Sequence, residues 1–208
     1  MNFDWVNMLY SIPAVILGLT IHEFSHAYIA NKLGDDTAKS QGRVTLNPIM
    51  HIDPLGMVFI ILAGFGWAKP VQFNPEKLLS PKRDKILIAL AGPLSNLIVG
   101  ILFLFVIKIF LFFSYLVAEN TYTIIINILF YISVINLGLF IFNILPIPPL
   151  DGSHIFLSGL DLTPASEQKF MKFGSYALFA VLFIENRANI DIIPISKFTN
   201  YIVGLFFK

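Results

Sequence analysis

A polar cluster embedded in an apolar run is the feature that most constrains this chain. The residues His22-Glu23-Phe24-Ser25-His26 directly follow Trp5–Ile21, a run that carries no formal charge. Charged side chains are costly in hydrocarbon, so those found inside a bilayer usually pair with one another or serve a function. The sequence therefore predicts a first membrane-spanning helix that contains a functional polar site.

The composition places the whole chain in the membrane class. Hydrophobic residues make up 56%, charged residues 13%, and the mean hydropathy is +0.76, well beyond the range of soluble domains. Further long uncharged runs cover 86–107 and 120–150, and shorter apolar stretches of ambiguous type cover 55–68, 173–184 and 192–207. We expect an all-α polytopic membrane protein with four to six transmembrane or re-entrant helices, forming one membrane-embedded domain over residues 1–208.

Charge and cysteine content exclude several kinds of function. The net charge is only +1 and the basic residues form no long block, so no nucleic-acid partner is expected. The chain has no cysteine, which excludes disulfides and thiolate metal ligands. Histidine, aspartate and glutamate are left as the candidate ligands of a metal ion.

The connection after the first helix, 34–85, sets the expected orientation. It is rich in basic residues and so should face the cytoplasm by the positive-inside rule: Lys39, Arg43, Lys69, Lys77, Lys82, Arg83 and Lys85. The fragments 42–46 and 69–73 predict short strands, which would form a small β element in this loop. An unpaired edge of that element could receive an extended peptide by strand addition.

The spacing of the two histidines predicts a metal site. His22 and His26 are four residues apart, so on a helix both project from one face and can bind one Zn²⁺. Glu23 would lie beside the metal-bound water. A catalytic zinc usually takes three protein ligands, so one more is required.

The best candidate for the third ligand follows a segment that cannot be helical. Prolines at 146, 148 and 149 break the returning span near Leu145, and Asp151 comes directly after them. Irregular backbone at membrane depth is tolerated only beside protein or a water-filled cavity. Because this span ends on the same side as the first helix, Asp151 should reach the depth of His26. The alternative is that Asp151-Gly152 is a simple turn.

Together these motifs resemble those of a known family. HEFSH at 22–26, Gly92-Pro93-Leu94-Ser95-Asn96, and Asn143 followed by Pro146, Pro148 and Asp151-Gly152 are similar to the site-2 proteases of peptidase family M50. The resemblance is to a minimal form without a PDZ-like or nucleotide-sensing domain. It implies one Zn²⁺ per chain, held by His22, His26 and Asp151, with Glu23 as catalytic acid and base.

The same resemblance implies a polar role near the reacting carbonyl for Asn143, although an interhelical hydrogen bond is the usual use of such a residue. Asn96 could likewise serve the reaction or form an interhelical hydrogen bond, and it is not placed in the catalytic set. His51 and His154 could support the site from outside the ligand set or could be structural.

The expected function is an intramembrane zinc-dependent endopeptidase that cuts peptide bonds in or near transmembrane segments. Its partners would be a transmembrane protein or peptide substrate and the lipid bilayer; the oligomeric state stays open. The expected location is the prokaryotic cytoplasmic membrane, with the active site nearer the cytoplasmic face. The biological role would be regulated intramembrane proteolysis or clearance of signal-peptide remnants. The alternatives are a metal-ion transporter, which would need polar groups continuing to the other face, and a non-catalytic membrane scaffold.

Overall fold

The computed structural model describes residues 5–63, 66–160, 162–188 and 192–207. Within these ranges the chain is helical, with short 3₁₀ turns in the connections. The α-helices are α1 (Trp5–Lys32), α2 (Thr37–Ser40), α3 (Pro54–Ala63), α4 (Pro81–Phe112), α5 (Glu119–Asn143), α6 (Asp151–Ser158), α7 (Pro164–Ala188) and α8 (Ile195–Phe206).

Three of these helices, α1, α4 and α5, are long and apolar enough to cross a membrane. The predicted four to six crossings are not confirmed in the described ranges. Helices α3 and α8 have 10 and 12 residues, too few to span a bilayer. Helix α7 has 25 residues but carries charges near both ends, at Glu167, Lys169, Lys172, Glu185 and Arg187.

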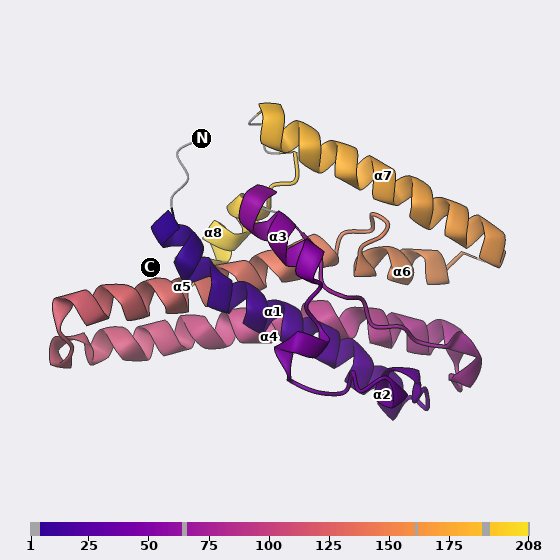
Figure 1. The fold of residues 1–208 in the computed structure, drawn as a ribbon, viewed down its shortest axis with the longest axis horizontal. Coiled ribbons are helices and arrows are strands. Elements are labelled where there is room, and N and C mark those ends of the chain that lie inside the picture. Colours follow the sequence, from indigo (N-terminus) through magenta and orange to yellow (C-terminus); the bar gives the residue numbers. More distant parts are fainter. Residues whose placement is uncertain (1–4, 64–65, 161, 189–191, 208) are drawn as a thin grey trace.

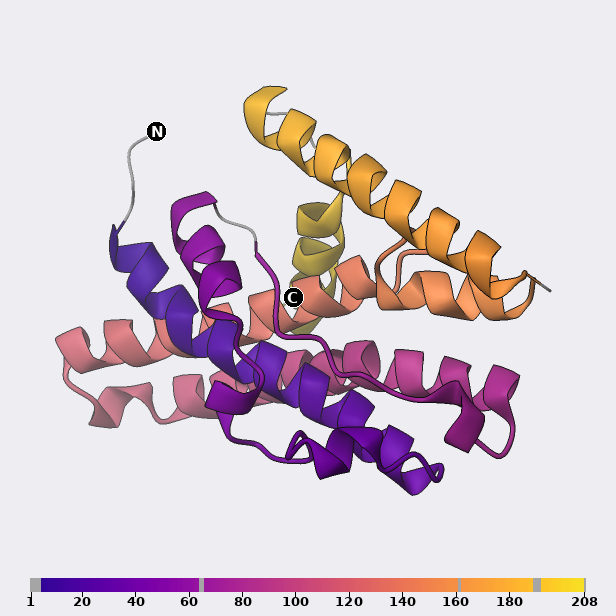
Figure 2. The same cartoon turned by 45° about the vertical axis from the view of Figure 1, so that its right-hand side comes forward.

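The three apolar helices pack against one another. Helices α4 and α5 run side by side, and α1 lies across both (Figures 1 and 2). Ala14, Val99 and Ile132, one from each helix, form a shared buried cluster. Small residues permit the close approach: the Ser133 hydroxyl of α5 donates to the Gly100 carbonyl of α4 at 2.9 Å. This three-helix unit brings the polar cluster of α1 against the middle of α4.

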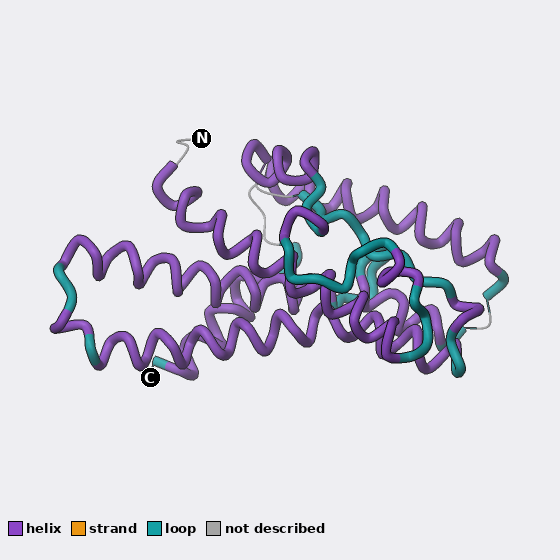
Figure 3. The backbone as a smooth tube through the Cα atoms, turned by 60° about the horizontal axis from the view of Figure 1, so that its bottom comes forward, coloured by secondary structure: helices purple, strands orange, loops and turns teal. Residues whose placement is uncertain are grey.

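The predicted strands at 42–46 and 69–73 are wrong, because both segments are irregular. In the described ranges the β pairing consists of one isolated antiparallel bridge between Ile52 and Ala68, and Figure 3 draws helices and loops without a strand. The physical reason lies in the hydrogen-bond partners. The Lys69 carbonyl accepts from the Arg43 guanidinium, and the Val71 amide donates to the Glu23 carboxylate. Side chains thus take backbone groups that a strand partner would otherwise use.

The predicted break before Asp151 is confirmed. Helix α5 ends at Asn143, residues 144–150 are irregular, and α6 begins at Asp151. The turn is tight, since a Cβ added at Gly152 would lie 2.2 Å from the Ile144 carbonyl oxygen. Helix α6 packs against α4, which directs the start of α6 toward the histidine face of α1.

Candidate metal centre

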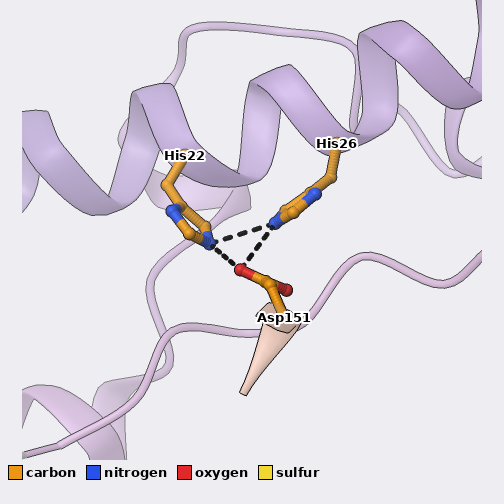
Figure 4. Close-up of side chains that lie close together, drawn as sticks. All are labelled: His22, His26 and Asp151. Atoms are coloured by element: carbon orange, nitrogen blue, oxygen red, sulfur yellow. Dashed lines mark hydrogen bonds and ion pairs between the residues drawn. The ribbon is translucent and has the colours of Figure 1, made fainter. Parts of the chain in front are cut away.

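His22, His26 and Asp151 converge on one point. His22 and His26 project from adjacent turns of α1, and Asp151 faces them from the start of α6 (Figure 4). The two Nε2 atoms are 3.0 Å apart, and Asp151 Oδ2 lies 3.0 Å from Nε2 of His22 and 3.4 Å from Nε2 of His26. Tetrahedral ligands with bonds of about 2.0 Å stand about 3.3 Å from one another. The observed spacing therefore suits one small tetrahedral metal ion.

The hydrogen bonds behind the imidazoles determine their tautomers. Nδ1 of His26 lies 2.7 Å from the Ile88 carbonyl oxygen, which can only accept, so Nδ1 carries the proton. Nδ1 of His22 lies 2.6 Å from Asn96 Oδ1. The Asn96 amide is oriented by its own donors, which reach the Gly18 carbonyl at 3.0 Å and Asn136 Oδ1 at 2.9 Å. Both Nε2 atoms are consequently left as lone-pair acceptors, as ligation requires.

Three acceptors facing one another repel unless a cation lies between them. Asp151 Oδ2 is buried, and no donor within the described ranges hydrogen-bonds to it. An unpaired buried carboxylate oxygen is costly, and a metal ion offsets that cost. The donor set of two neutral imidazoles and one carboxylate is one that catalytic zinc uses, with the fourth position open. The residues present thus fit a catalytic zinc ion.

Gly92 explains how α4 can approach the two imidazoles so closely. A Cβ at this position would lie 2.3 Å from Nε2 of His26 and 2.7 Å from Nε2 of His22. Only a glycine leaves room for a metal ion there. Asn96 follows four residues later on the same helix face. The motif at 92–96 therefore provides space at one position and a hydrogen bond to His22 at the other.

Glu23 is buried beside the ligand set and has its own partner. Its Oε2 accepts a hydrogen bond of 2.9 Å from the Val71 amide. The predicted polar residue Asn143 is part-buried, and its amide donates to the Leu139 carbonyl of its own helix at 3.0 Å. No contact between Asn143 and the ligand set is described, so its role near the reacting carbonyl stays a prediction.

The two remaining histidines are not ligands in this arrangement. His51 is fully buried in the loop, and its Nε2 donates to the Thr45 carbonyl at 2.7 Å. Burial lowers the pKa of His51 below its ordinary value, which favours the neutral ring. His154 lies on α6, three residues after Asp151, and no hydrogen bond from its ring to the ligand set is described.

Sequence reasoning missed three parts of this site. The sequence does not distinguish Asn96 and Asn136 from asparagines that join helices, and the Ile88 carbonyl leaves no signal because any residue has one. A signal did exist for the two asparagines. Polar amides in uncharged spans need partners in lipid, and two of them on neighbouring helices can satisfy each other.

Comparison with known proteins places these residues in a family. A donor set of this kind beside a buried glutamate is typical of metal-dependent hydrolases. The model of peptidase family M50 matches residues 112–184, which contain Asn143 and Asp151. YwhC of Bacillus subtilis is 43% identical over 183 residues, covering 85% of this chain and 81% of YwhC. No solved structure matches the chain.

Two other relatives are more distant. MJ0611 of Methanocaldococcus jannaschii is 31% identical over 160 residues, covering 74% of this chain and 72% of MJ0611. Rip2 of Mycolicibacterium smegmatis is 28% identical over 146 residues, 68% of this chain and 53% of Rip2, so the chain spans about half of that relative. All three are named as zinc metalloproteases. The chain belongs to peptidase family M50, the site-2 protease family, and is a metalloprotease.

Proposed function

We propose that this chain is an intramembrane zinc-dependent endopeptidase that hydrolyses peptide bonds in or near transmembrane segments of membrane proteins. His22, His26 and Asp151 bind one zinc ion, and Glu23 is the catalytic acid and base. The observation that carries the proposal is the convergence of two Nε2 atoms and one carboxylate oxygen within 4.8 Å of one another. The names of the relatives support zinc as the metal.

Zinc at this position supplies Lewis-acid activation of water and of the scissile carbonyl. Glu23 takes a proton from the attacking water and passes it to the leaving amine. A carboxylate has two oxygens, so Glu23 can accept from the Val71 amide through Oε2 and carry the proton on Oε1. Asn96 and the Ile88 carbonyl keep the imidazoles in the tautomer that binds metal throughout the cycle.

The membrane setting defines the substrate class. The ligands of α1 lie in the second half of a helix that is long and apolar enough to cross a bilayer. A substrate helix shields its carbonyls in backbone hydrogen bonds, so a segment must unwind before it can be cut. Helix-breaking residues near the cleavage position therefore favour hydrolysis. The basic connection that follows α1 supports a site nearer the cytoplasmic face, and the proposed location is a prokaryotic cytoplasmic membrane.

The proposal is tested with purified protein and single-span substrates in detergent. Glu23→Gln should lower kcat by about 10²- to 10⁴-fold, the usual contribution of a general acid and base. Its zinc content should equal that of the wild type, because Glu23 is not a ligand. Glu119→Gln, at an exposed glutamate at the start of α5, is the matched control and should cleave normally.

Chelation provides a second arm. Removal of the metal should stop cleavage, and added zinc should restore it. Cleavage that persists in chelator, or a Glu23→Gln protein that cuts at the wild-type rate, would refute the mechanism. Zinc flux in proteoliposomes without any proteolysis would instead support the transporter alternative.

A further inference from the structure

The carboxylate of Glu23 is connected to the loop that follows α1. The Val71 amide donates to Glu23 Oε2 at 2.9 Å, across 48 residues of sequence. A backbone amide is a directional donor whose position depends on the segment that carries it. The placement of Glu23 therefore depends on whatever fixes residues 68–71.

Both backbone groups of Lys69 are engaged by the first part of the same loop. The Lys69 amide donates to the His51 carbonyl at 2.8 Å, and the Lys69 carbonyl accepts from the Arg43 guanidinium. The neighbouring residue Ala68 forms the isolated bridge with Ile52. Val71 is only two residues further along. Fixing Lys69 on both sides consequently limits where the Val71 amide can point.

Arg43 is an unusual residue to find buried here. Only 3% of the surface of Arg43 is exposed to solvent, although guanidinium groups are normally solvated. A buried cation is costly unless it is hydrogen-bonded and faces an opposite charge. Burial lowers the pKa of Arg43, and the negative charge of Glu23 acts in the opposite direction. The Lys69 carbonyl and the nearby Glu23 charge together account for its position.

We infer that Arg43 is a positioning residue for the proposed acid and base: by holding the Lys69 carbonyl it sets the Val71 amide, which in turn orients Glu23. The inference rests on the proposed function, since it assigns Arg43 a part in a reaction carried by Glu23. No hydrogen bond between Arg43 and the proposed metal ligands is described. It acts through the segment 69–71.

The test compares Arg43→Ala and Arg43→Lys with wild-type protein and with Lys39→Ala, an exposed cation in the same connection. Arg43→Ala should lower kcat by about 10- to 100-fold, as expected when a catalytic group is misplaced by about 1 Å. KM and zinc content should stay within twofold of the wild type. Arg43→Lys should recover part of kcat, since an ammonium can still donate to the Lys69 carbonyl but lacks the planar guanidinium fork. Lys39→Ala should behave as wild type.

Hydrogen exchange supplies a readout that does not depend on turnover. In Arg43→Ala, amide exchange in peptides covering 69–73 should rise about fivefold, the equivalent of one lost hydrogen bond. Exchange in α4 and α5 should not change. If Arg43→Ala fails to fold, Arg43→Lys becomes the test. A reduced kcat at full zinc content supports the inference, and a wild-type kcat contradicts it.

Three outcomes would overturn the inference: a kcat near the wild-type value in Arg43→Ala, a loss of zinc that parallels the loss of kcat, or unchanged exchange at 69–73. These outcomes are distinct from failure of the proposed function. In that case the wild-type protein itself would not cleave, or Glu23→Gln would remain active.

Discussion

The two imidazoles and Glu23 lie on the same two turns of α1 but are supported by different kinds of structure. Behind the imidazoles stand the transmembrane helices: Asn96 and the Ile88 carbonyl belong to α4. Behind Glu23 stands an irregular loop, through the Val71 amide. The two imidazoles are therefore held by the helix bundle, whereas the placement of Glu23 depends on loop contacts.

The hydrogen-bond networks on the two sides differ as well. The Asn96 amide uses both its oxygen and its nitrogen in described hydrogen bonds. On the loop side, Arg43 Nε and His51 Nδ1 are buried without a hydrogen-bond partner in the part of the chain that the structure describes. Fully satisfied buried networks rigidify a core, and partly satisfied ones are less stable. Changes behind the imidazoles should thus affect metal binding, and changes in the loop should affect kcat or local stability.

The largest effect on the metal side is expected from Gly92→Ala. The added Cβ would lie 2.3 Å from Nε2 of His26, within the space that the metal needs. Zinc affinity should fall by more than about 100-fold, the upper limit for loss of one outer-shell partner. Zinc titration with a competing chelator measures it.

Gly204→Ala is the matched control for this substitution, because a Cβ there meets nothing within 4 Å. It should retain wild-type zinc affinity. A Gly92→Ala protein that binds zinc normally would show that α4 can move away from the imidazoles, and would remove the argument that the bundle is rigid at this point.

A smaller effect is expected from Asn96→Ala, which removes the acceptor behind His22 Nδ1. Zinc affinity should fall by about 10- to 100-fold. The fall in kcat at saturating zinc should be much smaller, because Glu23 keeps its loop contact. Asn127→Ala on α5 is the control, since the Asn127 amide bonds to the Thr123 carbonyl of its own helix. A loss of kcat at saturating zinc without a loss of affinity would contradict the proposed division between the two sides.

The smallest effect is expected from His51→Gln, in the pH dependence of the unfolding temperature. Burial lowers the pKa of His51 in the folded chain, so its contribution to stability is present above the ordinary pKa of about 6.5 and is lost as the pH falls below it. Between pH 7.5 and 5.5 the wild-type unfolding temperature should drop further than that of His51→Gln. The difference between the two drops in unfolding temperature should be at most about 4 °C, which corresponds to about 1 kcal/mol of unfolding free energy in a chain of this size.

This comparison is made on metal-free protein, so that metal binding contributes to neither curve. Thermal unfolding in detergent measures it. Parallel curves for the two proteins would mean that His51 has the same pKa in the folded and unfolded chain.

The convergence of His22, His26 and Asp151 was predictable because each of the three had a local reason. His22 and His26 follow from helical spacing, and Asp151 follows from prolines that end a returning span. The end of the returning span is predicted near Leu145, and α5 ends two residues earlier, at Asn143. These features depend on periodicity and on residues that cannot continue a helix.

The loop was not predictable in the same way. The segments 42–46 and 69–73 have the composition of strands. In the second segment, however, the backbone groups of Lys69 and Val71 are taken by the distant side chains of Arg43 and Glu23, and in the first the Thr45 carbonyl accepts from His51. The support from Ile88 is a carbonyl, which every residue possesses. The number of crossings depended on short apolar stretches such as 192–207, and part of that stretch forms the 12-residue helix α8. Pairings between distant residues decided the first two cases, and the length of a short helix decided the third.

The separation of the ligands along the chain has a consequence for biosynthesis. Two of the proposed ligands are at residues 22 and 26, and the third is at residue 151. During translation the first helix enters the membrane long before Asp151 is made, and two histidines alone leave the zinc one protein ligand short. Under the proposed mechanism, the emerging chain should not hydrolyse its neighbours until Asp151 is in place. The late position of Asp151 in the sequence would thus delay activity, as a cleavable inhibitory segment does in a zymogen.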